Sequence, residues 1–313
     1  MRNQPFPPFF PLSNNNKSQN AAQNVNWAKN VVPTRMALIN PFAGVFPVVS
    51  YLHVPRKMPH AQWLMIGTCF LIEPPTAEIR NRAPAIFLTA AHTFIPWKYS
   101  SNPAELKIPA DFRKPRYCTG NICLYDGDGR SSNTEKFAVH LAAVHPTLDV
   151  ALLTLSLQDC DAFLSRVYQR QLWHCFRLMP ASCPFPIGSP VTITGFRGRG
   201  RIGELDTLNE EVVKRLSKED QAALLREMTP IEGKQDGVSC GLCVTGTGVA
   251  QQTHFQCYNG MSGAPVQHST DKRLAIGVIT KKMGQNSVGF ETSTDILNWC
   301  ETLFRQPEGD VSE

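Results

Sequence analysis

The chain has 313 residues, of which 42% are hydrophobic and 18% are charged, and its formal net charge is +5 at pH 7. This is the composition of a globular protein with enough material for one large or two modest domains. It argues against a transmembrane helix, because no apolar run approaches the roughly 18 residues that a span requires. The basic residues are scattered among acidic ones, so no nucleic-acid-binding stripe is indicated.

The start of the chain is expected to be disordered. Residues 1–30 are rich in Asn, Gln, Pro and Ser, and no Asp or Glu occurs before Glu73. Such a composition buries too little apolar surface to offset chain entropy, so we assign residues 1–40 to an Asn/Pro-rich extension. The apolar core of a secretory signal is missing, which favours an intracellular protein. Because an acid-free start is also a trait of transit peptides, the expected compartment is mitochondrial or otherwise cytosolic.

Most of the remaining chain has the pattern of short strands. Apolar, β-branched and aromatic runs alternate with Gly, Pro, Asn and Asp, which is typical of an all-β sandwich or barrel. The predicted strands cover residues 44–54, 62–71, 85–91, 137–144, 149–157, 190–196, 244–250, 263–267, 274–281 and 287–291.

Two segments have helical patterns instead. Residues 204–230 include a stretch rich in Glu, Lys, Leu and Ala with apolar spacings of three and four, which predicts a helical insertion between strands. Ser293-Thr294-Asp295 caps a predicted C-terminal helix. We therefore expect a first β domain over residues 41–157 and a linker over 158–180. A second domain over 181–305 would contain the insertion, and 306–313 would be a tail.

The ten cysteines allow two interpretations. Cys240-Gly241-Leu242-Cys243 is a lone CxxC motif, and together with Cys118 and Cys123 it could supply four zinc ligands. No second CxxC or CxxH motif accompanies it, so we favour small buried thiols in a reducing compartment. We expect neither a metal nor a cofactor.

Three segments carry the groups that acyl transfer needs. Ser262 lies in Asn259-Gly260-Met261-Ser262-Gly263-Ala264-Pro265, a tight turn in which backbone N–H groups can meet an oxyanion. A serine hydroxyl needs a neighbouring base, and that base needs a carboxylate to fix its tautomer. His92 ends the apolar segment Leu88-Thr89-Ala90-Ala91-His92, and Asp149 begins Asp149-Val150-Ala151-Leu152-Leu153.

With these motifs the chain resembles the trypsin-like (chymotrypsin-fold) serine proteases, in which His, Asp and Ser follow one another in this order. The resemblance extends over about residues 44–303. It implies two six-stranded antiparallel β-barrels and a serine endopeptidase acting on protein or peptide substrates. The further matching motifs are Gly67-Thr68-Cys69-Phe70-Leu71-Ile72, Gly188-Ser189-Pro190-Val191, Ile276-Gly277-Val278-Ile279-Thr280 and Gly289-Phe290.

The resemblance also implies roles for individual residues. His92 would be the general base, Asp149 its orienting carboxylate, and Ser262 the nucleophile. The N–H groups of Gly260 and Ser262 would form the oxyanion hole. Thr280 would lie near the buried carboxylate and begin the strand that pairs with an extended substrate. The substrate pocket would be formed by Gln256, Cys257, Tyr258, Thr280, Lys281 and Lys282.

Two departures separate the chain from secreted trypsins. Thr93 stands where those enzymes have a cysteine bridged to the preceding strand, so Cys69 lacks that partner. Met261 stands where they have the aspartate that receives a new N-terminus on activation. These departures place the resemblance closer to the intracellular HtrA/Deg-type branch, without its PDZ domain. We expect Met261 to pack as apolar surface under the oxyanion loop.

Specificity and function leave alternatives open. Gln256 is not the acid that selects Arg or Lys, while Lys281 and Lys282 either favour acidic side chains or are solvated lysines at a strand end. The protein is a protease, a protease-chaperone of the HtrA type, or a catalytically silent or latent module in a larger assembly. The N-terminal extension and the helical insertion are the segments expected to mediate assembly or homo-oligomerisation.

Overall fold

The computed structural model describes residues 40–74, 85–100, 108–125, 134–181, 185–198, 217, 235–253, 258–284 and 286–305. Several predicted features lie outside the described residues: the extension up to residue 39, the helical insertion apart from Ser217, and the tail 306–313. The same holds for Gln256 and Cys257 of the predicted pocket.

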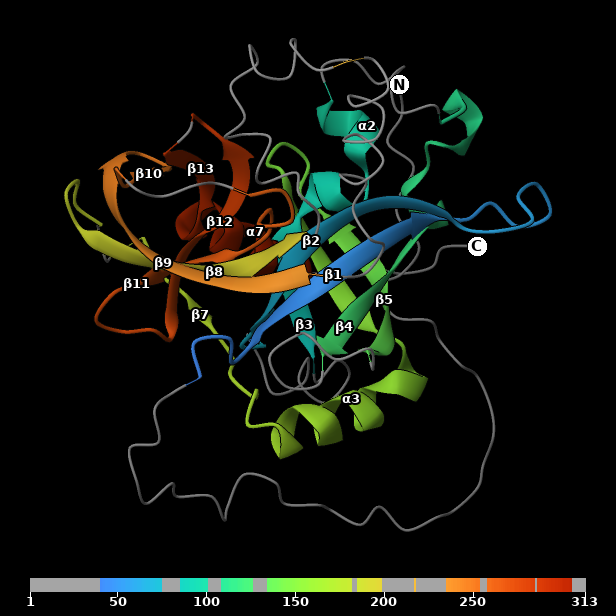
Figure 1. The fold of residues 1–313 in the computed structure, drawn as a ribbon, viewed down its shortest axis with the longest axis horizontal. Helices are drawn as coiled ribbons and strands as arrows, with labels where there is room; N and C mark the ends of the chain where they lie inside the picture. The colour runs from blue at the N-terminus through green and yellow to red at the C-terminus, as the bar shows by residue number, and fades with distance from the viewer. Residues whose placement is uncertain are drawn as a thin grey trace. The chain divides into compact units, whose positions relative to one another are not determined.

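The first half of the chain closes into a six-stranded barrel (Figure 1). Neighbouring strands are antiparallel in the order β1-β2-β3-β6-β5-β4, and pairing of β4 with β1 completes the ring. Every edge is therefore paired within the barrel. The strands are β1 (Val45–Leu52), β2 (Gln62–Ile72), β3 (Ile86–Ala90), β4 (Cys118–Tyr125), β5 (Thr134–Val144) and β6 (Val150–Leu155).

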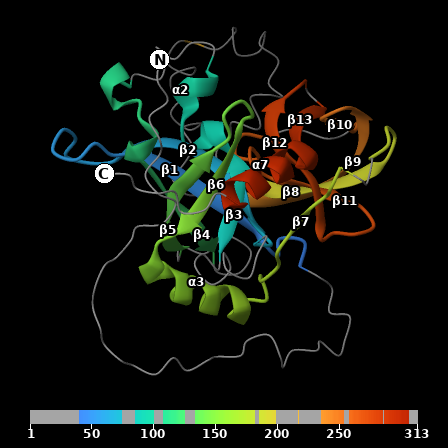
Figure 2. The same ribbon diagram turned by 180° about the vertical axis from the view of Figure 1, so that it is seen from behind.

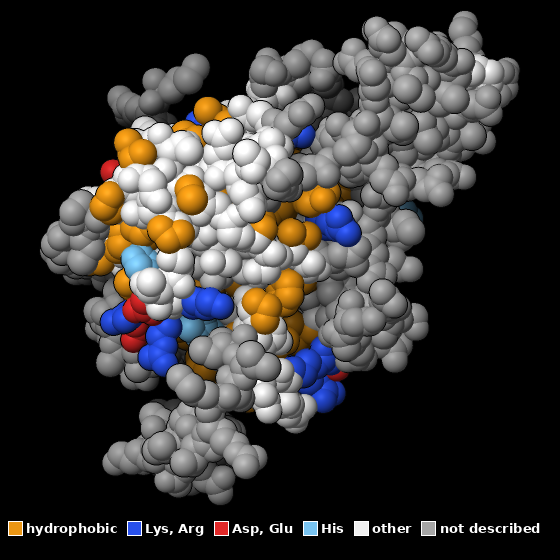
Figure 3. All heavy atoms as spheres, turned by 60° about the vertical axis from the view of Figure 1, so that its left-hand side comes forward, with side chains coloured by type: hydrophobic (Ala, Val, Ile, Leu, Met, Phe, Trp, Pro, Cys, Tyr) orange, Lys and Arg blue, Asp and Glu red, His pale blue; other side chains and the backbone are white. Residues whose placement is uncertain are grey.

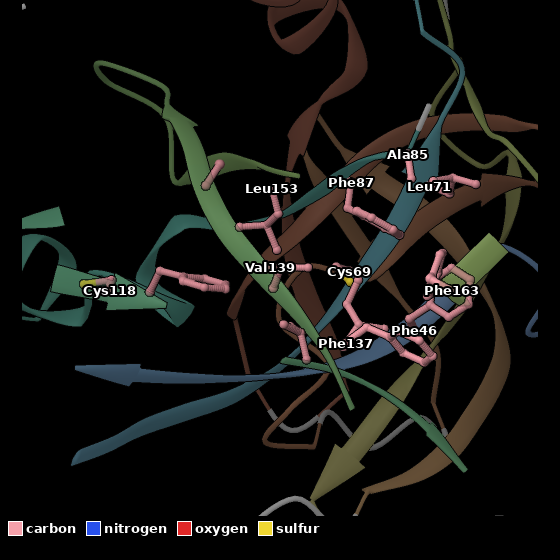
Figure 4. Packing of buried hydrophobic residues seen from close by; sticks show 14 of the residues in the cluster. Phe46, Cys69, Leu71, Ala85, Phe87, Cys118, Phe137, Val139, Leu153 and Phe163 are labelled. Carbon is pink, nitrogen blue, oxygen red and sulfur yellow. The ribbon is translucent and has the colours of Figure 1, made fainter. Parts of the chain in front are cut away.

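A helix closes one end of this barrel. α3 (Leu157–Gln169) begins at Ser156, whose hydroxyl accepts the N–H of Asp159 at 3.2 Å. Its Phe163 ring packs edge-on against Phe46, Phe87 and Phe137, with centroids 5.4, 5.6 and 5.3 Å away (Figure 4). Full burial of such a ring contributes about 1.5–3 kcal/mol. The segment predicted as a linker thus contains a helix that completes the core.

The second half forms the other barrel. Its sheet runs β11-β8-β9-β10-β13-β12-β7, and pairing of β11 with β12 closes six strands into a ring, to which β7 is added in parallel. The expected pair of six-stranded antiparallel barrels is confirmed, as is the C-terminal helix. The elements are β7 (Arg177–Leu178), β8 (Pro190–Gly198), β9 (Gln235–Gly246), β10 (Val249–Gln251), β11 (Pro265–His268), β12 (Leu274–Lys282), β13 (Ser287–Thr292) and α7 (Ser293–Arg305).

One predicted strand was wrong. The run 244–250 crosses a turn at Thr247 and Gly248, which separates β9 from β10. Gly248 has a φ of +69°, and a Cβ there would lie 2.7 Å from the carbonyl oxygen of Phe290. Only glycine suits this position, and its place within an apolar run concealed the turn.

Five of the eight described cysteines are buried, namely Cys69, Cys118, Cys123, Cys160 and Cys300, whereas Cys175 and Cys240 are half-buried and Cys243 is exposed. Burial raises the pKa of Cys118 to about 12 and that of Cys123 to about 11. These two lie on β4 of the first barrel, whereas Cys240 and Cys243 lie on β9 of the second, and the described residues hold no group of three metal-binding side chains. The zinc alternative therefore gains no support. None of the described helices is long and apolar enough to cross a membrane.

Candidate active site

His92 and Asp149 lie at the same edge of the first barrel. β3 pairs with β6 so that Ala90 faces Val150. The short 3-10 turn η1 (Ala91–Thr93) then carries His92 back over the start of β6. The barrel register thus brings together two residues that are far apart in the sequence.

Asp149 holds both the ring and the backbone of His92. His92 Nδ1 lies 2.6 Å from Asp149 Oδ2, and the His92 backbone N–H donates to Asp149 Oδ1 at 2.8 Å. The two side chains are only 16% and 14% exposed. A neutral imidazole that donates from Nδ1 has its acceptor lone pair at Nε2. The pair therefore presents a proton acceptor away from the carboxylate.

A short helix after His92 supports the loop that ends in Asp149. In α2 (Pro96–Tyr99), Lys98 Nζ donates to the carbonyls of His145 and Pro146 at 3.3 and 3.2 Å. The Tyr99 hydroxyl donates to the carbonyl of Leu148 at 3.0 Å. Burial, together with the negative charges of Asp149 and Glu291, raises the pKa of Tyr99, so its hydroxyl stays protonated.

His145 organises the same loop from within. Its Nδ1 accepts the N–H groups of Leu148 at 2.9 Å and Thr147 at 3.2 Å. Its ring meets the Trp299 ring of α7 edge-on, with centroids 5.1 Å apart. His145 lies in none of the motifs that the sequence contains, because its contacts with the loop and with Trp299 form only in the folded chain.

The turn that carries Ser262 is fastened to the first barrel by Thr68. The Thr68 N–H donates to the Ser262 carbonyl at 2.8 Å, and the Thr68 hydroxyl donates to the Gly260 carbonyl at 2.8 Å. The same hydroxyl accepts the N–H of Phe196 at 2.9 Å. A single buried threonine of β2 therefore joins β8 and the serine turn of the second barrel.

Glycine allows this turn to approach β3. Gly263 has a φ of +89°, and a Cβ there would overlap the Thr68 carbonyl oxygen and lie 2.9 Å from the backbone nitrogen of Ala90. Ala90 lies two residues before His92. The turn of Ser262 consequently reaches the end of β3 that leads to the histidine.

The backbone N–H groups of the turn divide into two sets. Met261 N–H donates to the carbonyl of Tyr258 at 3.3 Å, and Gly263 N–H donates to that of Ile279 at 2.7 Å. Among the described residues, the N–H groups of Gly260 and Ser262 have no protein acceptor. These are the two donors assigned to the oxyanion hole from the sequence. Within the same residues, no hydrogen bond joins the Ser262 hydroxyl to His92.

Met261 lies where the sequence predicts. Its side chain is 0% exposed and packs in the core of the second barrel. The cluster includes Ala264 and Ile279, which continue the chain and the sheet on either side of the turn. An apolar contact therefore stands where an acidic side chain would be desolvated at a cost of several kcal/mol.

The predicted pocket residues differ in their surroundings. Thr280 is 5% exposed, and its hydroxyl has no hydrogen-bond partner among the described residues. Its predicted place beside the carboxylate is thus not marked by a hydrogen bond. Lys281 and Lys282 are exposed at the end of β12. Tyr258 is half-buried and lies under the Arg197 guanidinium at 4.9 Å, a contact that the sequence did not indicate.

The strand order and closure of the two barrels define the trypsin-like fold. No family model and no curated protein matches the sequence. Among solved structures, the chain is similar to human heparin binding protein at 14% identity, covering 90% of this chain and 100% of that one, with a TM-score of 0.45. It is also similar to the scabies mite inactivated protease paralogue S-I1 at 13% identity, covering 85% and 95%, with a TM-score of 0.42. At these values the fold assignment depends on the topology of the chain itself.

Proposed function

We propose that the protein is a serine endopeptidase in which Ser262 attacks a peptide carbonyl, His92 is the general base and Asp149 orients the imidazole. The observation that carries the proposal is the double hydrogen bond from His92 to Asp149, beside a serine turn in which two N–H donors have no acceptor among the described residues. A packed core has no need of such an arrangement.

In each half of the proposed reaction, His92 first accepts a proton as general base and then donates it as general acid. His92 Nε2 takes the Ser262 proton as Oγ bonds to the carbonyl carbon, and the oxyanion accepts hydrogen bonds from the N–H groups of Gly260 and Ser262. His92 then returns the proton to the leaving amine, giving an acyl-enzyme. Water repeats the sequence and releases the acid. The Ser262–His92 hydrogen bond need not pre-exist, because such bonds often tighten only with substrate.

A peptide substrate fits the open end of β12. Val278 is the last residue of β12 that pairs with β11, while Lys281 pairs on its other side with Gly289 of β13. An extended peptide could add to the first side by backbone hydrogen bonding. Lys281 would then flank the bound chain, so a preference for acidic side chains remains part of the proposal.

The proposal extends to a reducing, intracellular setting. Cys69 is fully buried with no disulfide, and burial raises the pKa of its thiol well above the ordinary value. Thr93 is also buried, with its carbonyl accepting the Ser50 hydroxyl. Neither position requires oxidation for its packing. Reduced protein that retains its melting temperature in dithiothreitol would agree with this setting.

Labelling by a fluorophosphonate probe tests the proposed chemistry. The folded wild-type chain should be labelled, and Ser262→Ala should not. His92→Ala should slow labelling at least about 100-fold, since removing general-base catalysis commonly costs about 10²–10⁴. Ser189→Ala, on a distant turn, is the matched control and should label normally.

A non-catalytic module is the second candidate. Among the described residues, no hydrogen bond joins the Ser262 hydroxyl to His92. This observation favours a catalytically silent module or a latent site. If the wild-type chain is not labelled, with or without peptides that could order the site, the protease proposal fails and the module stands.

A further inference from the structure

Four cations gather in the first barrel where β1 ends and where β2 and β4 begin. Arg56 and Lys57 lie in the loop between β1 and β2, which projects from the barrel in both ribbon views (Figures 1 and 2). Lys114 and Arg116 lie just before β4. The His53 N–H donates to the Tyr117 carbonyl at 2.9 Å, so the two segments are joined. We call Arg56, Lys57, Lys114 and Arg116 the basic tip; all four are exposed.

The cations of the two segments lie close to neighbouring aromatic rings. Lys57 Nζ lies 5.7 Å from the centre of the Phe112 ring, and the Arg116 guanidinium lies 5.1 Å from that of Tyr117. A hydrogen bond from Arg116 lowers the pKa of the Tyr117 hydroxyl, and the charges of Arg116, Lys114 and Lys57 lower it further. The Tyr117 hydroxyl therefore lies within electrostatic range of cations from both segments.

The basic tip is not neutralised by ion pairs among the described residues: the exposed Asp111, in the same segment as Lys114, pairs with none of its four cations. Elsewhere Arg166 and Arg170 flank Glu135 at 3.1 and 3.4 Å, and Arg177 reaches Asp271 at 3.6 Å. On the face shown in Figure 3, Lys and Arg side chains at the lower edge also lie beside Asp or Glu. Within the described residues, no basic-tip side chain forms an ion pair.

The hairpin holds Arg56 in an unfavourable backbone conformation. Lys57 N–H donates to the Val54 carbonyl at 3.1 Å, with Pro55 second and Arg56 third in the turn. Arg56 has a φ of +65°. Pro followed by a residue with positive φ is the pattern of a type II turn, in which glycine is favoured at the third position. A cation stands at that position although the backbone there favours glycine.

β2 links the basic tip to the candidate active site. Thr68 contacts the Ser262 turn, and Gln62 begins the strand beside the hairpin loop. Six residues of extended strand cover about 20 Å. The serine turn is bonded to Ile279 on one side and to Thr68 on the other, so a peptide that lay along β12 and passed Ser262 would continue over β2.

We propose that the basic tip binds an acidic segment of the substrate, about six to eight residues from the scissile bond on the side that runs along β2, where an extended chain spans the distance. That the acidic segment belongs to a substrate rests on the proposed protease function, whereas the binding of an acidic peptide to the basic tip does not. An acidic polypeptide fits better than nucleic acid. The Phe112 and Tyr117 rings are covered by Lys57 and Arg116, which leaves them poorly placed to stack on bases.

Binding is tested with Ser262→Ala protein, which cannot cleave the probe. The probe is a fluorescein-labelled peptide with six consecutive Glu residues, read by fluorescence anisotropy. Lys57→Ala/Arg116→Ala should weaken binding about tenfold or more, whereas the matched pair Arg166→Ala/Arg170→Ala should change it less than about twofold, since salt-bridged surface cations contribute little. Raising the salt from 50 to 300 mM should weaken wild-type binding and remove most of the difference.

Arg56→Gly separates binding from folding. Glycine relieves the positive φ, so this variant should melt at the same or a higher temperature and still bind the probe more weakly. Equal binding by both basic-tip variants and the controls would overturn the proposal. So would tighter binding of a labelled oligonucleotide of equal charge.

Cleavage distinguishes this proposal from the protease function. Two peptide libraries carry the Glu run at the N-terminal or the C-terminal end. One of the two libraries should be cut faster by the wild type than by Lys57→Ala/Arg116→Ala. If the wild type and the variant cut each library at the same rate, the substrate assignment is contradicted. Binding without fluorophosphonate labelling would keep the acidic-peptide surface and reject the protease.

Discussion

The Nδ1 atom of His145 accepts the backbone N–H of Leu148 at 2.9 Å, directly before Asp149. Lys98 and Tyr99, which follow His92, hold the carbonyls of the same loop. The position of the carboxylate is thus fixed by a histidine outside the proposed triad. His145 is a positioning residue, because it acts through Asp149.

Replacing His145 should slow the chemistry without removing any reacting group. A displacement of about 1 Å can cost about 100-fold in rate, so we expect His145→Ala to lower the fluorophosphonate labelling rate about 10- to 100-fold. His145→Asn should restore most of it, because an Asn oxygen can accept the N–H two residues on. The downfield proton signal of the His92–Asp149 hydrogen bond should weaken in the Ala variant and return in the Asn variant. Equal rates in both variants would contradict the positioning role.

His145 also predicts how stability depends on pH. Burial and the charge of Lys98 lower its pKa below the ordinary 6.5, opposed by Asp295. The unfolded chain then binds more protons, so this contribution is present above about pH 6.5 and is lost as the pH falls towards the lowered folded value. His174 shifts in the same direction through burial and Arg273. Between pH 7.5 and 5.5, the free energy of unfolding measured with urea should fall less for His145→Asn than for the wild type. The exposed control His140→Asn should lose as much of this free energy as the wild type.

Thr68 should matter both for folding and for the shape of the Ser262 turn. Thr68→Val removes the donor to Gly260 and the acceptor of the Phe196 N–H, leaving buried groups unsatisfied at a cost of about 1–3 kcal/mol. Labelling should slow more than the loss of folded protein explains. Thr68→Ser keeps the hydroxyl and should behave nearly as the wild type. The exposed Thr119→Val gives the background, and an equal effect there would remove any special role for Thr68.

Two glycines with similar backbone conformation but different surroundings provide a matched pair. Gly188 has a φ of +86° with nothing within 4 Å of an added Cβ, whereas an added Cβ at Gly263 would overlap Thr68. Gly188→Ala should cost about 1 kcal/mol of backbone strain. Gly263→Ala should cost at least about 3 kcal/mol, because overpacking is added to the same strain. Denaturant midpoints of the two variants measure these losses of stability. Similar losses would show that backbone strain alone determines the cost at both sites.

The sequence predicted the parts of the fold that depend on local pattern. Apolar alternation located most strands, and the motifs around His92, Asp149 and Ser262 located the candidate site. β4 was missed because its buried positions Cys118, Gly120, Ile122, Cys123 and Leu124 include a glycine and two thiols. These residues do not form a typical β-branched run.

Other features depend on contacts that no local pattern encodes. α3 is amphipathic, but its reason to form is the cluster of phenylalanines from three strands. The roles of Thr68 and His145 depend on partners from the other barrel and from α7. The positive φ of Arg56 could not be expected from the sequence, because glycine is the residue usually found at that position of the turn.

The double attachment of Thr68 has a consequence for partial unfolding. The hydrogen bonds that hold the two barrels together at this point also shape the Ser262 turn. An opening between the two barrels would therefore disconnect the Ser262 turn while both barrels kept their own sheets. Subglobal openings of this kind are less costly than global unfolding. Fluorophosphonate labelling of Ser262 should disappear at a lower denaturant concentration than the β-sheet circular dichroism signal, so that the Ser262 turn reports on the alignment of the two halves.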